Sequence, residues 1–253
     1  MLYELERVLR SKFESPVSYP PNSIILASFP KSGNSWFRFV VSNVNAVHSG
    51  EEYANFQNIG IYAPEIRGNR KLEGAKIFQE LPLFLKTHFP YNKYFEGVKA
   101  VSLTRNPFYV IPSYYEYLNN ARGKKLSNLN DFFWHWRYGF NAWAKFTESW
   151  LETSITLKYE DFVAEPCSCF SSLYDKLGYR IPETVIHEAV EKSTRKDMAA
   201  VLKEKGDPHN INGFKFVKEK GENKGVINLK DEILSSKQCS YLFKDILMEL
   251  GYD

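Results

Sequence analysis

Short apolar runs alternate along this chain with longer stretches in which apolar residues recur at helical spacing. Four apolar runs are predicted as strands: 24–29, 83–87, 98–103 and 155–159. The first run is continuously apolar, which is typical of a parallel strand buried on both faces. Helical spacing predicts helices over the following segments: 2–12, 34–47, 107–120, 130–150, 161–177, 182–192 and 231–250. Alternating strands and helices predict an α/β fold with one central parallel sheet flanked by helices.

Two segments follow neither pattern. Residues 48–76 show no clean periodicity, and a long irregular segment of this kind is often a functional loop or lid. Residues 203–230 hold seven Lys and four Gly with little apolar content, which favours a mobile basic loop. No internal repeat or domain boundary is visible, so we expect a single domain over residues 1–253.

The composition excludes several classes of protein. A hydrophobic content of 43% and a charged content of 25% are ordinary for a soluble globular chain. The net charge of +3 is too small to predict a nucleic-acid partner. No apolar run is long enough to span a membrane, and acidic residues in the first 19 positions argue against a secretory signal. Three cysteines without metal-ligand spacing fit a reducing compartment, so we expect a cytoplasmic protein without a metal site or a membrane partner.

The most informative motif is the sequence Phe-Pro-Lys-Ser-Gly-Asn-Ser-Trp over residues 29–36, between the first predicted strand and a helix. A helix N-terminus presents unpaired backbone N–H groups and the positive end of the helix dipole. With Gly33, two hydroxyl groups and Lys31 in the loop, this segment predicts an anion-binding, P-loop-like site.

A second candidate anion site follows the third predicted strand. Arg105-Asn106-Pro107 comes directly after that strand, and Ser113 lies eight residues beyond Arg105. Three strands thus end at Lys31, His88 and Arg105, and parallel sheets bind ligands at the carboxyl ends of their strands. Two anion sites on one sheet suggest a nucleotide with phosphate groups at both ends.

These motifs together resemble the nucleotide-dependent sulfotransferases, which transfer a sulfuryl group from 3′-phosphoadenosine 5′-phosphosulfate (PAPS). Residues 29–36 resemble the 5′-phosphosulfate loop of that family, Tyr-Pro-Lys-Ser-Gly-Thr-Thr-Trp. Residues 85–90, Leu-Lys-Thr-His-Phe-Pro, resemble its catalytic segment. Residues 105–115 match its 3′-phosphate segment in residue type and spacing, although Phe108-Tyr109 stands where the family often has Lys-Asp. Residues 158–162 resemble its Tyr-Glu-Asp segment, so four motifs occur in the family's order.

The resemblance implies a role for each matching residue near the 5′ side and the reacting group. The 5′-phosphosulfate would be held by the loop residues Lys31, Ser32, Gly33, Asn34 and Ser35, with the Asn34 side chain capping the helix. Lys31 would stabilise the charge on the departing phosphate. His88 would act as general base and Lys86 would hold the sulfuryl oxygens.

The resemblance also implies contacts to adenine and to the 3′-phosphate. Trp36 would stack on adenine and Tyr159 would hydrogen-bond to it. Arg105 and Ser113 would bind the 3′-phosphate, with Pro112 expected to kink the helix before Ser113. Two further matches are imperfect. Ser193 and Arg195 match a family segment that contacts the nucleotide, with Arg195 in place of an adenine-stacking Phe. Lys220-Gly221 matches a family loop at the 3′-phosphate, where Lys218, Lys220 or Lys224 would supply the charge.

The implied reaction is in-line transfer of a sulfuryl group to a hydroxyl or an amine of a small organic acceptor, with adenosine 3′,5′-bisphosphate (PAP) leaving and no metal required. Aromatic residues in 48–76, 91–95 and 134–143 are candidates for lining the acceptor pocket. Two alternatives stay open from the residues alone. A P-loop kinase using ATP and Mg²⁺ would also have a phosphate loop, although here Lys31 precedes Gly33 rather than following it. The other alternative is a nucleotide-binding module without activity.

Overall fold

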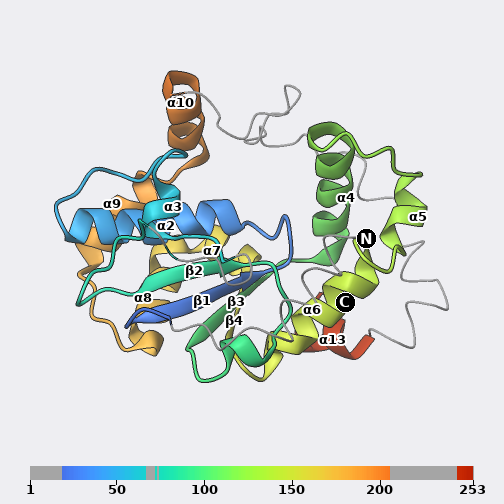
Figure 1. Ribbon diagram of the computed structural model, residues 1–253, viewed down its shortest axis with the longest axis horizontal. Helices are drawn as coiled ribbons and strands as arrows, with labels where there is room; N and C mark the ends of the chain where they lie inside the picture. The colour runs from blue at the N-terminus through green and yellow to red at the C-terminus, as the bar shows by residue number, and fades with distance from the viewer. Residues whose placement is uncertain (1–18, 67–71, 73, 206–243, 253) are drawn as a thin grey trace.

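The structure is a computed structural model that describes residues 19–66, 72, 74–205 and 244–252. Its centre is a four-stranded sheet in which every pairing is parallel (Figure 1). The strands are β1 (Ser23–Ser28), β2 (Leu83–Thr87), β3 (Ala100–Thr104) and β4 (Ile155–Lys158), in the spatial order β2-β1-β3-β4. The predicted α/β fold with a central parallel sheet is confirmed. The assignment of all 253 residues to one domain stays a prediction.

The alternation of side chains along β1 explains why the sheet is covered on both faces. Ile24 and Leu26 pack into one hydrophobic cluster, and Ile25 and Ala27 pack into another. All four side chains are essentially inaccessible to solvent. Successive residues of a strand point to opposite faces, so a run without polar residues requires a layer of helices on each side.

The first face is covered by helices that lie next to one another in the structure. They are α2 (Asn34–His48), α7 (Tyr159–Ala164), α8 (Pro166–Leu177) and α9 (Glu183–Glu191) (Figure 1). A single helix over 161–177 was predicted, but the structure has two helices that meet at Glu165. Glu165 has φ −132° and ψ 66°, because the residue before a proline is disfavoured in the helical region and Pro166 follows it.

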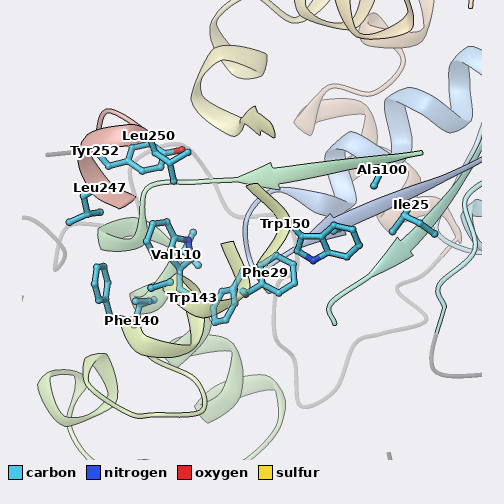
Figure 2. Close-up of a cluster of buried hydrophobic side chains, with 14 of the residues drawn as sticks. Ile25, Phe29, Ala100, Val110, Phe140, Trp143, Trp150, Leu247, Leu250 and Tyr252 are labelled. Carbon is cyan, nitrogen blue, oxygen red and sulfur yellow. The ribbon is translucent and has the colours of Figure 1, made fainter. Parts of the chain in front are cut away.

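The second face is covered by the elements between β3 and β4 together with the last helix of the described residues. They are α4 (Pro107–Glu116), the π-helical turn η2 (Tyr117–Ala121), α5 (Leu129–Phe133), α6 (Phe140–Leu151) and α13 (Lys244–Glu249). Their apolar side chains form the cluster in Figure 2, which contains Trp143 and Trp150.

The predicted helix over 130–150 is wrong as a single element. The chain leaves α5 at Trp134 and enters α6 at Phe140, with Gly139 at the junction. A Cβ atom on Gly139 would lie 2.2 Å from the carbonyl oxygen of Phe133, so the chain turns back on itself more closely than a side chain permits. The helical spacing of apolar residues continues across this break, because α5 and α6 both place apolar side chains in the same core cluster.

The helix after β3 passes through Pro112 and remains α-helical to Glu116. The chain then changes to the π-helical turn η2, which ends at Ala121. The predicted boundary at residue 120 is therefore close, although the last turn has a different hydrogen-bonding pattern. Turns of this kind inside a helix often occur at functional sites.

Much of the irregular segment 48–76 is packed against the protein. It contains the short helix α3 (Ile59–Tyr62), whose buried residues contact α2 and Met198 of α10 (Arg195–Lys205). Beyond α3, the backbone of residues 64–66 pairs with Lys86 through two hydrogen bonds of 2.8 Å, from Lys86 N to Pro64 O and from Ile66 N to Lys86 O. This segment therefore adds a short parallel bridge to the β2 edge of the sheet.

Three predicted segments lie wholly or largely outside the described residues: the helix over 2–12, the basic loop over 203–230, and the helix over 231–250 apart from α13. A short 3₁₀ turn, η1 (Lys93–Phe95), connects the end of β2 to β3. Within the described ranges, none of the helices combines the length and the apolar character needed to cross a bilayer.

Candidate active site

The loop between β1 and α2 has an unusual backbone conformation. Lys31 and Gly33 have φ angles of 72° and 93°, both in the left-handed region. Left-handed backbone is uncommon for a residue with a side chain, and such strain tends to occur at functional sites. The backbone N–H of Ser32 donates to the carbonyl of Phe29 over 3.2 Å, which closes a tight turn. The loop therefore brings the chain directly to the start of α2.

The start of α2 is suited to binding an anion. Gly33 occupies the N-cap position, with no side-chain capping bond there. The first backbone N–H groups of a helix lack partners within the helix, so those after Gly33 can receive a negatively charged group. The Ser32 side chain is fully buried, and its hydroxyl oxygen has no hydrogen-bond partner in the part of the chain that the structure describes.

Asn34 differs from its predicted role. The sequence predicted that its side-chain oxygen caps α2, but Asn34 is the first helical residue and Gly33 is the cap. Its side-chain nitrogen instead donates to the hydroxyl of Ser28 over 2.8 Å, and the Asn34 side chain is buried. The capping prediction is therefore wrong. The Asn34 side chain fastens the loop to the last residue of β1.

Three other predicted site residues meet around the ring of Tyr159, the first residue after β4. A Cβ atom on Gly33 would lie 2.2 Å from Cδ2 of that ring, so only glycine fits where the loop passes it. The Arg105 guanidinium carbon lies 4.6 Å from the ring centroid. Trp36 contacts the ring edge to face, with centroids 6.2 Å apart. Elements that follow β1 and β3 thus converge on Tyr159, which itself follows β4.

Arg105 connects the two candidate anion sites. Its Nη1 atom donates to the backbone carbonyl of Lys31 over 3.2 Å. The next residue, Asn106, caps α4 by accepting a hydrogen bond from the backbone N–H of Phe108 over 3.0 Å. Ser113 is half-buried further along α4, and its carbonyl accepts the backbone N–H of Tyr117. The loops after β1 and β3 therefore lie side by side.

His88 follows β2 and points toward the end of β1. Its Nδ1 atom lies 2.6 Å from the backbone carbonyl oxygen of Ser28. A carbonyl oxygen can only accept, so Nδ1 carries a proton and the neutral ring has its lone pair on Nε2. Burial, followed by the positive charge of Lys86, lowers the pKa of His88 to about 3. The imidazole is therefore neutral near pH 7, as a general base must be.

Lys86 lies near His88 and is paired with an acid that sequence reasoning missed. Its ammonium group lies 3.0 Å from Oε1 of Glu65, in the segment that bridges to β2. Arg38 of α2 donates through Nε to the carbonyl of Ala63 over 2.9 Å, and burial lowers its pKa to about 10. The sequence did not indicate either residue. Glu65 lies in a segment without periodicity, and Arg38 lies on a helix whose sequence predicts a buried core helix.

Lys31 was predicted to act on the leaving phosphate. Its ammonium nitrogen lies 5.0 Å from the ring centroid of Tyr117 in the π-helical turn η2. A cation over an aromatic face is held without losing its charge. Tyr117 is a third neighbour of the site that sequence reasoning missed, although its place just beyond the 3′-phosphate motif could have pointed to it.

The structure does not bring every predicted residue to the site. Ser193 is fully buried, where its hydroxyl donates to Ala189 O over 2.7 Å and accepts from Asn43 Nδ2 over 2.9 Å. These bonds fasten α9 to α2, and they do not support a contact between Ser193 and a cofactor. Arg195 is exposed at the start of α10. Lys218, Lys220, Gly221 and Lys224 lie outside the described residues.

The aromatic segments predicted to line an acceptor pocket are largely part of the core. Trp143 is fully buried, while Tyr91 and Phe95 pack against the ring of Trp150 with centroids 5.3 and 5.2 Å apart. Trp136 and Tyr53 are exceptions, with 72% and 42% of their surfaces exposed. The described residues hold no group of three or more His, Cys, Asp or Glu side chains arranged to bind a metal ion.

The fold and the site together define an α/β protein with a parallel sheet. The loop after β1 is suited to binding an anion, and the neutral His88 lies near it. The model of the sulfotransferase domain family matches residues 21–231 of this chain. The chain belongs to the sulfotransferase domain family. The sequence prediction of a PAPS-dependent sulfotransferase is thus confirmed at the level of family and class of enzyme.

The curated relatives have low sequence identity to this chain, but the matches cover most of its length. Sulfotransferase 1A1 of Rattus norvegicus is 25% identical over 199 residues, covering 70% of this chain and 67% of that protein. Sulfotransferase 1E1 of Cavia porcellus is 23% identical over 197 residues, covering 70% and 66%. The chain therefore matches about two thirds of the length of each of these relatives.

Solved structures show the same fold. A retinol dehydratase in complex with retinol and PAP superposes with a TM-score of 0.65 at 19% identity, covering 91% of this chain and 82% of that one. A mouse sulfotransferase complexed with PAP superposes with a TM-score of 0.55 at 16% identity, covering 92% and 90%.

Proposed function

We propose that this protein transfers a sulfuryl group from PAPS to a hydroxyl group, or an amine, of a small organic acceptor, with His88 as general base. The observation that carries the proposal is the pair of bonds at Ser28. The carbonyl of Ser28 orients His88, and its hydroxyl holds Asn34 at the start of the anion-binding loop. One residue at the end of β1 thus contacts both His88 and the loop that would hold the sulfuryl donor, which supports His88 as the base.

The residues around the loop fit the donor nucleotide. The backbone N–H groups of residues 32–35 and the buried Ser32 hydroxyl would hold the 5′-phosphosulfate. Arg105 would bind the 3′-phosphate, since a guanidinium has five N–H donors and its bond to Lys31 O uses one of them. Trp36 and Tyr159 would contact the adenine from the same corner of the site.

The proposed reaction is an in-line displacement at sulfur. The acceptor oxygen attacks sulfur while His88 Nε2 takes its proton, and the bond from sulfur to the bridging oxygen breaks. Negative charge then builds on the phosphate of PAP, where Lys31 stabilises it. Lys86, held by Glu65, would contact the sulfuryl oxygens in the transition state. The protein thus contributes mainly positioning and charge, as in phosphoryl transfer.

Two further parts of the proposal draw on the relatives. Retinol and androsterone, which are bound beside PAP in retinol dehydratase structures, are small apolar alcohols. This supports a small-molecule acceptor with a hydroxyl group for the present chain. An Arabidopsis relative, 26% identical over 121 residues covering 42% of this chain and 34% of that protein, is named a cytosolic sulfotransferase. We accordingly propose a cytoplasmic enzyme that acts on metabolites rather than on nucleic acids or membranes.

Calorimetric titration of the protein with PAP, AMP and ATP–Mg²⁺ tests the nucleotide. Tight binding of PAP with weaker binding of AMP and ATP–Mg²⁺ supports the proposal. Preference for ATP–Mg²⁺ would instead favour the kinase alternative, and indifference to the 3′-phosphate would contradict a PAPS site.

The His88→Ala variant tests the base. We expect kcat to fall about 10²-fold to 10⁴-fold, the usual contribution of a general base, while the affinity for PAP changes little. An equal loss of PAP binding would make His88 a structural residue. Wild-type protein that binds PAP but transfers no sulfuryl group to any of a panel of phenols, alcohols and amines would favour the inactive binding module.

A further inference from the structure

We propose that Tyr252 is a positioning residue for the 3′-phosphate segment, which it holds through Glu160 and the backbone of Asn106. The inference rests on the proposed function, because it takes Arg105 as the group that binds the 3′-phosphate. Sequence motifs gave no indication of it, since Tyr252 lies far along the chain from every motif of the site.

The buried hydroxyl of Tyr252 acts as a hydrogen-bond donor. It donates to Oε2 of Glu160 over 3.0 Å, and only 4% of the Tyr252 surface is exposed. Burial and the neighbouring Glu160 charge raise the pKa of Tyr252, so the hydroxyl keeps its proton. The ammonium nitrogen of Lys158 lies 4.9 Å from the centroid of the Tyr252 ring on the same corner of the sheet.

The other oxygen of the Glu160 carboxylate reaches the 3′-phosphate segment. The backbone N–H of Asn106 donates to Oε1 of Glu160 over 3.0 Å. Asn106 directly follows Arg105 and caps α4, so its peptide plane sets the direction in which Arg105 leaves β3. Glu160 is thus held from one side by Tyr252 and holds Asn106 on the other.

Tyr252 is kept in place by packing as well as by this bond. Leu247 and Leu250 are buried in the same core cluster, and the Tyr252 backbone N–H donates to Leu247 O over 2.8 Å. Figure 2 shows Leu247, Leu250 and Tyr252 grouped with Val110, Phe140 and Trp143 at one end of that cluster. The Tyr252 and Trp143 ring centroids are 6.4 Å apart. Removing the hydroxyl alone should therefore leave the ring where it is.

The effect should be confined to the 3′ side of the nucleotide. Besides the bond from Arg105 to the Lys31 carbonyl, the loop after β1 has a fastening of its own, the bond between Asn34 and Ser28, which does not involve Glu160. A loosened Asn106 would therefore change the placement of Arg105 most, while the backbone N–H groups at the start of α2 keep their places. AMP carries only the 5′-phosphate, so its affinity reports on the loop after β1. The affinity for PAP reports on that loop and on the segment after β3.

The test compares PAP and AMP binding by calorimetry in the Tyr252→Phe variant. We expect PAP to bind about tenfold more weakly, on the scale of one hydrogen bond to a charged group, with AMP binding unchanged. In turnover assays, KM for PAPS should rise with little change in kcat. The Glu160→Gln variant, which keeps the size of the side chain and removes its charge, should show the same selective loss.

Tyr174→Phe is the matched control. Tyr174 is also fully buried, but its hydroxyl has no hydrogen-bond partner among the described residues, so PAP binding should stay at the wild-type level. Equal losses of PAP and AMP binding in Tyr252→Phe would show a general structural role and overturn the proposal, as would unchanged PAP binding. Wild-type protein that does not distinguish PAP from AMP would instead contradict the proposed function itself.

Discussion

The loops after β1 and β3 lie side by side, yet they are held in different ways. The loop after β1 is shaped by its own backbone, with left-handed conformations at Lys31 and Gly33 and a helix that starts at once. The segment after β3 is held by side chains from elsewhere: Glu160 lies 54 positions from Asn106, and Tyr252 lies 92 positions from Glu160. The first loop depends on which residues it contains, and the second depends on how distant elements pack.

This difference suits the two tasks. A strained backbone beside a helix N-terminus keeps N–H groups in a rigid arrangement around the group that reacts. In the proposed reaction the 3′-phosphate takes no part in the chemistry, so the segment proposed to bind it would only need a correctly placed Arg105. Substitutions in the two regions should therefore separate binding of the 5′ side from binding of the 3′ side.

The largest effect is expected for Gly33→Ala. The alanine would have to adopt a φ angle of 93° and would place its Cβ 2.2 Å from the Tyr159 ring. Left-handed backbone alone costs about 1–2 kcal/mol, and the overlap adds to it. We expect loss of both PAP and AMP binding and a lower free energy of unfolding, measured by calorimetry and denaturant titration.

Gly178→Ala is the control for Gly33→Ala. Gly178 has a φ angle of 88° but nothing within 4 Å of a built Cβ, so it reports the backbone cost without the overlap. It should lower the free energy of unfolding by about 1–2 kcal/mol and leave nucleotide binding intact. If Gly33→Ala behaves no differently from this control, the contact with Tyr159 does not shape the loop.

A smaller effect is expected from a pair of asparagine substitutions, one in each region. Asn34→Ala removes the bond to Ser28 and should weaken AMP and PAP binding alike. Asn106→Ala removes the cap of α4, which costs about 1 kcal/mol, and should weaken PAP binding while sparing AMP. Calorimetry with both nucleotides checks the pair. The same pattern from both variants would mean that the two loops move as one unit.

The last prediction concerns the pH dependence of stability and His88, which follows β2 and is held by the end of β1. Its folded-state pKa of about 3 lies below the ordinary value of 6.5, so between these values the unfolded chain binds the proton and the folded protein does not. This contribution to stability is present above pH 6.5 and is lost as the pH falls toward 3. Denaturant titrations at pH 7, 5 and 4 should show a weaker pH dependence in His88→Gln than in wild type. Equal dependence would mean that His88 has an ordinary pKa in the folded protein.

The parts of the fold that the sequence predicted well are those with a local cause. All four strands, α2 and the loop over residues 29–36 follow from apolar runs, glycine and the start of a helix. The helices over 130–150 and 161–177 were predicted too long, because periodicity does not show that a chain reverses at Gly139 or breaks before Pro166. The capping role of Asn34 was wrong because Ser28, six positions earlier, provides a competing buried partner.

The sequence by itself determined the motifs and predicted their chemistry: the motif residues Lys31, His88 and Arg105 at three strand ends were readable before the fold was known. Tertiary structure alone decided which partners hold the motif residues. Glu65 pairs with Lys86, the Ser28 carbonyl accepts from His88, and Tyr252 donates to Glu160. The reason is physical. A motif depends on residue types within one short segment, whereas a buried acid or hydroxyl acquires its role from a partner that packing brings near from far along the chain.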